Sequence, residues 1–424
     1  MLHEKLVCTT VMVVLFFLSS VCCGSNISSS PTGPDEKASD SYIKSIIESV
    51  DFLKKNAYSP EARVFYSDID NKGRVSTSKV YLVSLSRTIY ALSFSSKYVP
   101  ENLALAKQSA EFLTENLIFE HDGLAYFLPE YDLSSGSSPK VRELDVWQQA
   151  YGLTGLVELY RNWPDPELFR IIELMHIAFV NRFSDLKNGG FWGRYSLENG
   201  PIFSSKSFQS TVYPVTAYMN NLWAISPNPK PLQALLSKHV QYAHDYLWDS
   251  AKNWINIRFD SDWGVCPNAD GKCFSVAPGH NFQLAWLLLN TRNWTFISKE
   301  NQHKYDILGR RIISATLEKE IWGESSKGGF FSEYDPSDSQ RISHLKAWWQ
   351  HSEAIIALSF YDPSSQKLKD LLDFFELSFK DRVYGGEYFY LDKDNRPILT
   401  EPKSSIGKSA YHTVEMYRFL IENL

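Results

Sequence analysis

The feature that most constrains the fold is a type of segment that recurs six times along the chain. Each copy is rich in aromatic residues that lead into Asp, Asn, Gly or Pro, and the copies recur about every 55 to 75 residues. This pattern is typical of a short β-hairpin. The six segments are ARVFYSDIDNKGR near Phe65, DGLAYFLPEYD near Tyr126, GGFWGRYSLENGP near Phe191, SDWGVCPNADGK near Trp263, GGFFSEYDPSD near Phe330 and GGEYFYLDKDNRP near Tyr388.

Two helices accompany each hairpin in the predicted unit. Before most hairpins lies a plain amphipathic helix, such as residues 102–118 or 165–183, and after each hairpin comes a segment with apolar residues at helical spacing. We call the segments after the hairpins the inner helices, and they cover residues 79–94, 142–160, 208–225, 278–290, 344–360 and 407–424. The pattern therefore predicts an all-α fold with short hairpins between outer and inner helices.

Six helical pairs can bury their inner helices against one another by closing into a ring. An open helical solenoid has the same periodicity and stays an alternative. The ring is favoured because it would gather the polar and aromatic residues near the inner-helix N-termini into one concave pocket, where helix ends donate to oxygen-rich ligands. These residues are Arg87, Trp147, Gln148, Tyr213, His280, Gln283, Trp348, Trp349, Glu353 and His412. We predict a single (α/α)6 barrel over residues 41–424 with a sugar-sized, aromatic pocket.

The N-terminal 24 residues have a short polar start with Lys5, an apolar run and then small residues, which is typical of a secretory signal peptide. A membrane anchor is the alternative, but the apolar run is shorter than the roughly 20 residues that a spanning helix needs. Residues 25–40 are polar and contain Pro and Gly, which predicts a disordered lead-in. We therefore expect a secreted or secretory-pathway protein without membrane contact after cleavage.

Two further features fit a secretory route. Beyond the leader the chain keeps only Cys266 and Cys273, which enclose a short loop and predict one local disulfide. A zinc site is the alternative, but no second Cys or His pair has ligand spacing. Asn26 and Asn293 match the sequon for N-glycosylation.

Composition narrows the class of ligand. The chain is 44% hydrophobic and 22% charged with 12 Trp, 23 Tyr and 26 Phe, which supplies a large core and leaves rings for a cavity. A net charge of −6 without a basic stripe argues against nucleic acid or an anionic membrane as partner. The sequence has no phosphate-binding glycine loop, nucleophile elbow or metal-spaced histidine cluster, so we expect no cofactor and no metal. A small carbohydrate is the expected ligand, and the sequence is compatible with a homodimer.

His280 and His412 are the candidates for acid–base chemistry. They occupy comparable places in the fourth and sixth units, and histidine can accept and return a proton near neutral pH. Two histidines on different sides of a sugar could remove a proton next to a carbonyl and return it. The alternative for each is a structural histidine on an apolar helix.

The segment KAWWQHSEAIIAL supplies further candidates. Glu353 lies four residues after Trp349, on the same helix face, and could orient a sugar hydroxyl or a histidine. A solvated or core glutamate is the alternative. Trp348 and Trp349 suit stacking on a sugar, although neighbours on a helix diverge by about 100° and one of them is expected to stack. His351 points elsewhere by helical spacing and is expected to be peripheral.

A glycoside hydrolase is a second interpretation of the same barrel. Such an enzyme needs two carboxylates across the scissile bond. Glu143, Asp145 and Glu353 are the candidates for them. The test between the two interpretations is whether carboxylates or the two histidines converge in the pocket.

Three segments resemble the N-acylglucosamine 2-epimerase superfamily, which includes cellobiose 2-epimerases and mannose isomerases. They are PGHNFQLAWLLL, KAWWQHSEAIIAL and GKSAYHTVEMYRFL, separated by GGFF-type hairpins, and the likeness runs from about Ser41 to Leu424. The resemblance implies a six-fold α/α barrel. It also implies proton transfer at C2 of an open-chain sugar through an enediolate, without a cofactor.

The resemblance also implies roles for single residues. His280 and His412 match the two acid–base histidines of the family, and Arg87 matches an arginine that stabilises charge on O1 and O2 of the sugar. Trp349 and Glu353 match a WWxQxE segment, and Trp286 matches a largely structural tryptophan. We expect the substrate-binding residues to be Arg87, Tyr213, Gln283, Trp348, Trp349 and Glu353.

The chain departs from the family pattern at four positions. Gln283 replaces a glutamate three residues after the first histidine, and Tyr213 stands where many members carry a third histidine. Thr216 replaces another glutamate, and Glu415 replaces an arginine three residues after the closing histidine. These departures predict either a changed substrate or chemistry, or a catalytically silent carbohydrate-binding relative. A glycoside hydrolase or lyase remains the other alternative.

Overall fold

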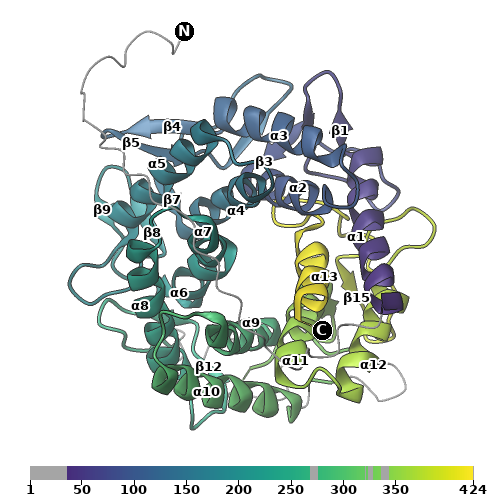
Figure 1. Cartoon of the computed structure of the whole chain (residues 1–424). Coiled ribbons are helices and arrows are strands. Elements are labelled where there is room, and N and C mark those ends of the chain that lie inside the picture. Colours follow the sequence, from purple (N-terminus) through teal and green to yellow (C-terminus); the bar gives the residue numbers. More distant parts are fainter. Residues whose placement is uncertain (1–35, 268–275, 320, 323–327, 336–342, 424) are drawn as a thin grey trace, which may run out of the picture.

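The computed structural model describes residues 36–267, 276–319, 321–322, 328–335 and 343–423. Over these residues the helices form two concentric rings that follow the chain around a common centre (Figure 1). The outer ring contains α1 (Glu36–Asn56), α3 (Asn102–Asn116), α5 (Pro166–Phe183), α8 (Lys230–Tyr246), α10 (Lys299–Leu317) and α12 (Gln366–Phe374), which η3 (Phe375–Phe379) extends. The predicted signal peptide and Asn26 lie outside the described residues.

The inner ring consists of the helices that follow the hairpins, as predicted. They are α2 (Leu82–Ser95), α4 (Val146–Asn162), α6 (Phe208–Pro214) with η1 (Val215–Met219) and α7 (Asn220–Ile225), α9 (Pro278–Asn290), α11 (Trp348–Tyr361) and α13 (Tyr411–Asn423). Most residues of the inner helices are buried, and every residue of α2 is buried. Outer helices bury one stripe only, which in α12 is Leu368, Leu371 and Phe374. The predicted all-α barrel is confirmed.

Short strands connect neighbouring units around the whole ring. Strand β3 (Lys79–Tyr81) pairs with β6 (Glu130–Asp132), β7 (Glu143–Asp145) with β8 (Arg194–Ser196), β10 (Lys206–Ser207) with β13 (Arg258–Phe259), and β14 (Lys346–Ala347) with β15 (Tyr390–Leu391), all antiparallel. Single bridges complete the circle, between Val276 and Tyr334 and between Ile69 and Ser404. Because the last bridge joins the sixth unit to the first, the ring is closed and the open solenoid is excluded.

The remaining strands form local hairpins near the outer helices. They are β1 (Tyr58–Ser59) with β2 (Val64–Phe65), β4 (Ile118–His121) with β5 (Leu124–Phe127), β11 (Trp248–Asp249) with β12 (Trp254–Ile255), and β9 (Gly200–Pro201), which pairs with β8. A 3-10 turn, η2 (Thr291–Asn293), follows α9. Both glycines of the GG pairs have positive φ, for example Gly328 at 66° and Gly329 at 68°. Glycine adopts this conformation without a steric penalty, which explains the recurring GG.

Three predicted boundaries differ from the structure. Residues 79–81, 143–145 and 346–347 are strands, because they pair with the hairpin of the next unit before the inner helix begins. The third inner helix is interrupted by a π-helical segment directly after Pro214, which lacks the N–H of a regular helical bond. Helix α1 begins at Glu36, so residues 36–40 are helical and do not belong to a disordered lead-in. A helix anchored by buried Ile46 and Val50 extends over further residues at little cost.

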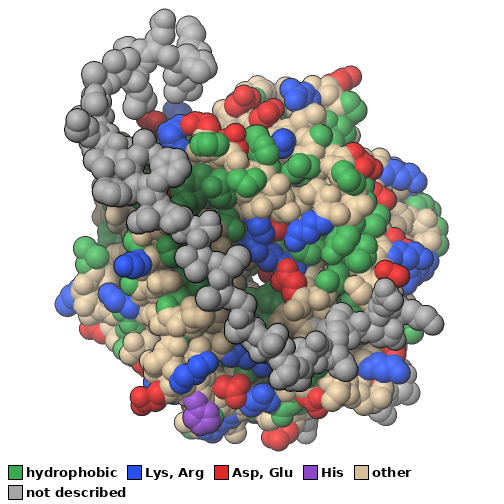
Figure 2. Space-filling model, viewed as in Figure 1, with side chains coloured by type: hydrophobic (Ala, Val, Ile, Leu, Met, Phe, Trp, Pro, Cys, Tyr) green, Lys and Arg blue, Asp and Glu red, His purple; other side chains and the backbone are tan. Residues whose placement is uncertain are grey.

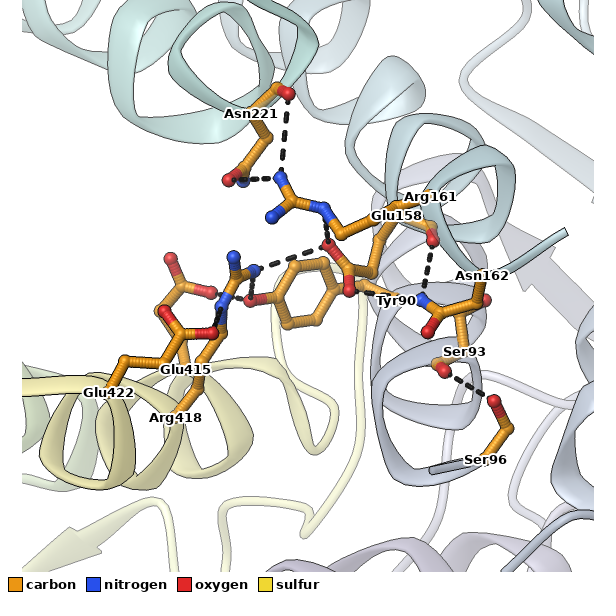
Figure 3. A network of polar contacts seen from close by, with 10 residues as sticks. All are labelled: Tyr90, Ser93, Ser96, Glu158, Arg161, Asn162, Asn221, Glu415, Arg418 and Glu422. Carbon is orange, nitrogen blue, oxygen red and sulfur yellow. Dashed lines mark hydrogen bonds and ion pairs between the residues drawn. The ribbon is translucent and has the colours of Figure 1, made fainter. Parts of the chain in front are cut away.

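A buried polar network joins the C-terminal halves of three inner helices (Figure 3). The Nη1 atom of Arg418 donates to Tyr90 Oη at 2.9 Å and lies 3.2 Å from Oε2 of Glu158, which Arg161 also approaches at 3.2 Å. Tyr90 donates to Glu415. Paired charges of this kind tolerate burial. Figure 2 shows acidic and basic side chains around the middle of the ring in the same view as Figure 1.

No helix within the described part of the chain is long and apolar enough to span a membrane.

Helices α2 and α4 pack so closely that replacing Gly155 by alanine should destabilise the fold. Ser86 Oγ donates to Gly152 O at 3.0 Å and accepts from the Gly155 N–H at 2.9 Å, and a Cβ on Gly155 would lie 2.2 Å from Ser86 O. We expect Gly155→Ala to lower the free energy of unfolding by about 1–3 kcal/mol or more, because overpacking displaces one helix. Urea unfolding measures this loss.

The matched control is Gly407→Ala, where the nearest atom to a new Cβ is Trp147 Cζ2 at 3.4 Å. This variant should unfold at the wild-type urea midpoint. Equal midpoints for Gly155→Ala and the wild type would contradict the close packing of α2 on α4.

Candidate active site

A cavity of about 400 Å³ lies where the N-terminal halves of the inner helices converge. Its size suits a small ligand such as a monosaccharide. Of the residues predicted to bind substrate, all but Glu353 line it, and His412 lines it as well. The complete lining is Arg87, Trp147, Tyr151, Gln209, Tyr213, Gln283, Trp348, Trp349, Phe389, Ser405, Ile406, Gly407 and His412.

Part of this lining was not predicted from the sequence. Tyr151 lies one helical turn after Trp147 on the same face, so helical spacing could have identified it. The loop 405–407 and Phe389 come from segments between helices, and no periodic pattern marks them. Trp348 and Trp349 both line the cavity, although we expected only one of them to stack.

His412 stands beside a buried carboxyl. Its Nδ1 atom lies 3.3 Å from Oε1 of Glu353, and Oε2 of Glu353 accepts a hydrogen bond from Trp286 Nε1 at 2.6 Å. Burial raises the pKa of Glu353 to about 8. Burial, together with the positive charges of Arg87 and Lys408, lowers the pKa of His412 well below its usual value. His412 is therefore a neutral imidazole at neutral pH and can accept a proton.

His280 lies behind Tyr213 and is not part of the lining of the main cavity. Its Nε2 atom is 3.0 Å from Oη of Tyr213, which does line the cavity. The imidazole packs between Phe208 and Trp349, with ring centroids 4.6 and 5.3 Å away. Burial lowers the pKa of His280 to about 4. His280 borders an adjoining cavity of about 310 Å³ that shares Trp349 and Gln209 with the first.

Arg87 supplies the positive charge of the cavity. Its guanidinium lies 4.2 Å from the ring centroid of Tyr151 and 5.1 Å from that of Tyr411. Nη1 donates to Gly407 O, while Nε is buried without a hydrogen-bond partner among the described residues. A guanidinium held between two rings is well placed to stabilise negative charge on a ligand oxygen.

The amide of Gln283 occupies the position of the expected glutamate. Its Nε2 atom contacts Thr216 Oγ1 at 3.5 Å, and its Oε1 is buried with no partner in the described part of the chain. His280 Nδ1 and Trp348 Nε1 are buried and unpartnered in the same way. Buried polar atoms normally have partners, so these atoms and Arg87 Nε are available to a ligand in or beside the cavity.

Carboxylates do not converge in the cavity. The lining within the described residues contains neither Asp nor Glu. Glu143 pairs with Arg194 at the surface, and Asp145 caps α4 by accepting from the backbone of Trp147 at 2.9 Å. The pair of carboxylates that a glycoside hydrolase needs is therefore not found among the candidates that the sequence suggested.

His351 is a core residue and not a peripheral one. It is fully buried, its Nε2 accepts from the Phe330 N–H at 3.1 Å, and its Nδ1 lies 2.7 Å from Ala347 O. These contacts anchor the hairpin that begins with Gly328 and Gly329. Helical spacing predicted correctly that His351 points away from the pocket, but spacing alone does not distinguish a surface from a second buried interface.

The structure describes only part of the features connected with secretion, namely Cys266 and Asn293. Cys266 forms no disulfide with any described residue, and Cys273 lies outside them, so the predicted pair stays a prediction. Asn293 is exposed in η2. Among the described residues, no group of three or more His, Cys, Asp or Glu is arranged to hold a metal ion.

Comparisons with known proteins agree with this picture. A family model described as N-acylglucosamine 2-epimerase (GlcNAc 2-epimerase) matches residues 233–416, which include His280, Glu353 and His412. No curated protein matches the sequence.

Several solved structures share the fold. Cellobiose 2-epimerase from Bacillus thermoamylovorans B4167 matches with a TM-score of 0.77 at 17% identity, over 91% of this chain and 100% of that chain. A D-mannose isomerase matches with a TM-score of 0.73 at 17% identity, over 93% of this chain and 100% of that chain. A family 76 glycoside hydrolase from a bovine Bacteroides thetaiotaomicron strain matches with a TM-score of 0.61 at 11% identity, over 90% of this chain and 78% of that chain. At these identities the likeness establishes the fold.

The burial of His280 and His412 predicts that both imidazoles titrate below the usual pH range of histidine. We expect the His280 and His412 imidazoles to stay neutral at pH 5.5, where a free histidine with a pKa near 6.5 is mostly protonated. Because the unfolded chain then binds more protons than the folded one, both residues lower stability as the pH falls below about 6.5, and for His280 this loss continues to about pH 4. An NMR titration checks this, with signals assigned from His280→Asn and His412→Asn. Titration of either imidazole near 6.5 would contradict the burial.

Proposed function

We propose that this member of the N-acylglucosamine 2-epimerase superfamily is a sugar 2-epimerase or aldose–ketose isomerase. The observation that carries the proposal is that His412 and Arg87 line one cavity whose wall also holds Tyr213, the residue in contact with His280. The ring centroid of Trp349 lies 6.0 Å from that of His412 and 5.3 Å from that of His280. The substrate would be a small sugar in its open-chain form.

The proposed reaction begins with removal of the C2 proton by a neutral imidazole. His412 is the base for one of the two C2 epimers, because it lines the cavity. The contact of its Nδ1 atom with Glu353 fixes the orientation of the imidazole. The electrons of the C–H bond move into an enediolate, whose negative oxygens Arg87 would stabilise. Both imidazoles are neutral at neutral pH, and a base must be unprotonated before it can act.

The second step decides between epimerase and isomerase. If the proton returns to the opposite face of C2 from the side of Tyr213 and His280, the product is the C2 epimer. If a proton is delivered to C1, the product is the ketose. Both outcomes use the same enediolate and the same residues.

A catalytically silent sugar-binding protein is the second candidate. Gln283 favours this candidate, because its amide leaves no carboxylate beside His280. Glu415 favours it as well, because this residue belongs to the buried network and supplies no group to the cavity. A glycoside hydrolase shares the barrel, but the cavity lining lacks a carboxylate pair.

We also propose that the chain enters the secretory route, as its leader predicts. Asn293 is exposed and would accept a glycan, and a pairing of Cys266 with Cys273 would fit an oxidising compartment. A mass shift after glycosidase treatment of the secreted chain, absent from Asn293→Gln, would support the assignment of Asn293.

The proposed function predicts deuterium exchange at C2. The mature chain in deuterated water should incorporate deuterium at C2 of at least one sugar among mannose, glucose, N-acetylmannosamine and cellobiose, as followed by proton NMR. His412→Asn should slow interconversion of the C2 epimers by about 10²–10⁴-fold, the usual contribution of a general base, while sugar binding persists. Binding without exchange by the wild-type chain would favour the silent candidate. Wild-type turnover in His412→Asn would remove its proposed role.

A further inference from the structure

Tyr213 separates His280 from the sugar cavity. Its side chain is part of the cavity wall and is half-buried, whereas His280 is absent from that wall. The hydroxyl contacts His280 Nε2 at 3.0 Å, so this ring nitrogen already has a partner. A sugar in the main cavity would therefore meet the phenol before it meets the imidazole.

The surroundings hold this pair in place. Phe208 contacts the rings of both partners, with centroids 6.0 Å from Tyr213 and 4.6 Å from His280. Trp349 packs against the imidazole from the cavity wall. Tyr213 also packs against Tyr151 at 5.6 Å between centroids, and Tyr151 carries the guanidinium of Arg87. The phenol thus lies beside the group that would stabilise the enediolate.

We propose that Tyr213 is the residue that exchanges a proton with C2 of the sugar on this side of the cavity, with His280 as its proton relay. This inference rests on the proposed function and changes the assignment of its second acid–base group. Tyr213 becomes a catalytic residue that touches the substrate. His280 acts through Tyr213 and does not contact the sugar itself.

The step balances with these two residues alone. The C2–H bond breaks, Oη of Tyr213 takes that proton, and the original phenolic proton passes to Nε2 of His280. The imidazole becomes an imidazolium, and the electron pair of the C–H bond forms the enediolate. In the reverse direction Nε2 returns its proton to Oη while Oη delivers its proton to C2. No oxidant, reductant or further reactant is needed.

Burial explains why the phenol needs the relay. Burial raises the pKa of Tyr213, so an isolated tyrosinate would not form in this wall. Transfer of the phenolic proton to the neutral imidazole, concerted with uptake of the C2 proton, avoids a free tyrosinate. Burial also lowers the pKa of His280 to about 4, so the imidazolium would form only together with the negative charge on the sugar that balances it.

The chain contains a matched pair outside the cavity. Tyr218 lies in η1, five residues after Tyr213, and its hydroxyl is 3.0 Å from Nδ1 of His176. Tyr218 is fully buried and is not part of the cavity wall. Tyr218→Phe therefore removes a phenol from a similar Tyr–His contact in the same inner helix, which α6, η1 and α7 form together, without touching the site.

The experiment measures C2 deuterium exchange separately for both members of a pair of C2 epimers. The pairs are glucose with mannose, N-acetylglucosamine with N-acetylmannosamine, and cellobiose with its C2 epimer. The variants are Tyr213→Phe, Tyr213→His, His280→Asn, His412→Asn and Tyr218→Phe, each checked for sugar affinity and thermal unfolding. Each base serves one epimer, so the pattern of loss identifies the face on which a residue acts.

The proposal expects opposite patterns for the two sides. Tyr213→Phe and His280→Asn should lose exchange of the same epimer by about 10²-fold or more and keep exchange of the other, and His412→Asn should show the reverse. Tyr213→His should recover part of the loss, because an imidazole can exchange the proton directly, and Tyr218→Phe should match the wild type. A merely structural role for Tyr213 would lower both exchange rates together with the unfolding temperature.

Two results would overturn the proposal. Wild-type exchange of both epimers by Tyr213→Phe, with loss in His280→Asn, would show that His280 acts on the sugar directly. Equal loss of both epimers in Tyr213→Phe, with unchanged affinity, would also exclude a role on one face. If the wild-type chain exchanges no sugar in any pair, the proposed function itself fails, and the relay fails with it.

Discussion

Closure of the ring is the constraint on which the rest of the structure depends. Helix α13 packs against α1, α2 and α11, and the bridge between Ile69 and Ser404 joins the first and last units. Closure buries most residues of the inner helices, which explains why they are mainly apolar and why their charged residues are paired or line the cavity. It also brings Arg87 of the first unit to the loop that precedes His412 of the last, where Nη1 donates to Gly407 O.

The two ends of the barrel use polar residues differently. At the end formed by the C-terminal halves of the inner helices, Glu158, Arg418 and Tyr90 satisfy one another and tie α2, α4 and α13 together (Figure 3). At the N-terminal end, Arg87 Nε and Gln283 Oε1 keep no partner among the described residues. The first arrangement stabilises a closed ring, and the second leaves polar groups for a ligand. This division explains how Glu415 can replace an arginine without placing a carboxylate in the cavity.

Periodicity predicted the architecture because each unit must bury the same faces. It also predicted which inner-helix ends converge, and so most of the cavity wall. It could not predict how deep a side chain lies, since helical spacing gives a direction only. His280 and Tyr213 both pointed to the centre from the sequence, but only the structure shows that Tyr213 lines the main cavity and that His280 does not. Two-residue strands such as Lys346–Ala347 also escaped prediction, because their partners lie in the next unit.

The most direct test of this account is a crystal structure of the chain with glucitol, a linear alditol that cannot close into a ring. We predict that its C2 lies between His412 and the hydroxyl of Tyr213, about 3–3.5 Å from the imidazole and from the phenolic oxygen, and that its O1 and O2 face Arg87. A sugar bound with C2 against His280, or outside the cavity lined by Trp349, would contradict the account.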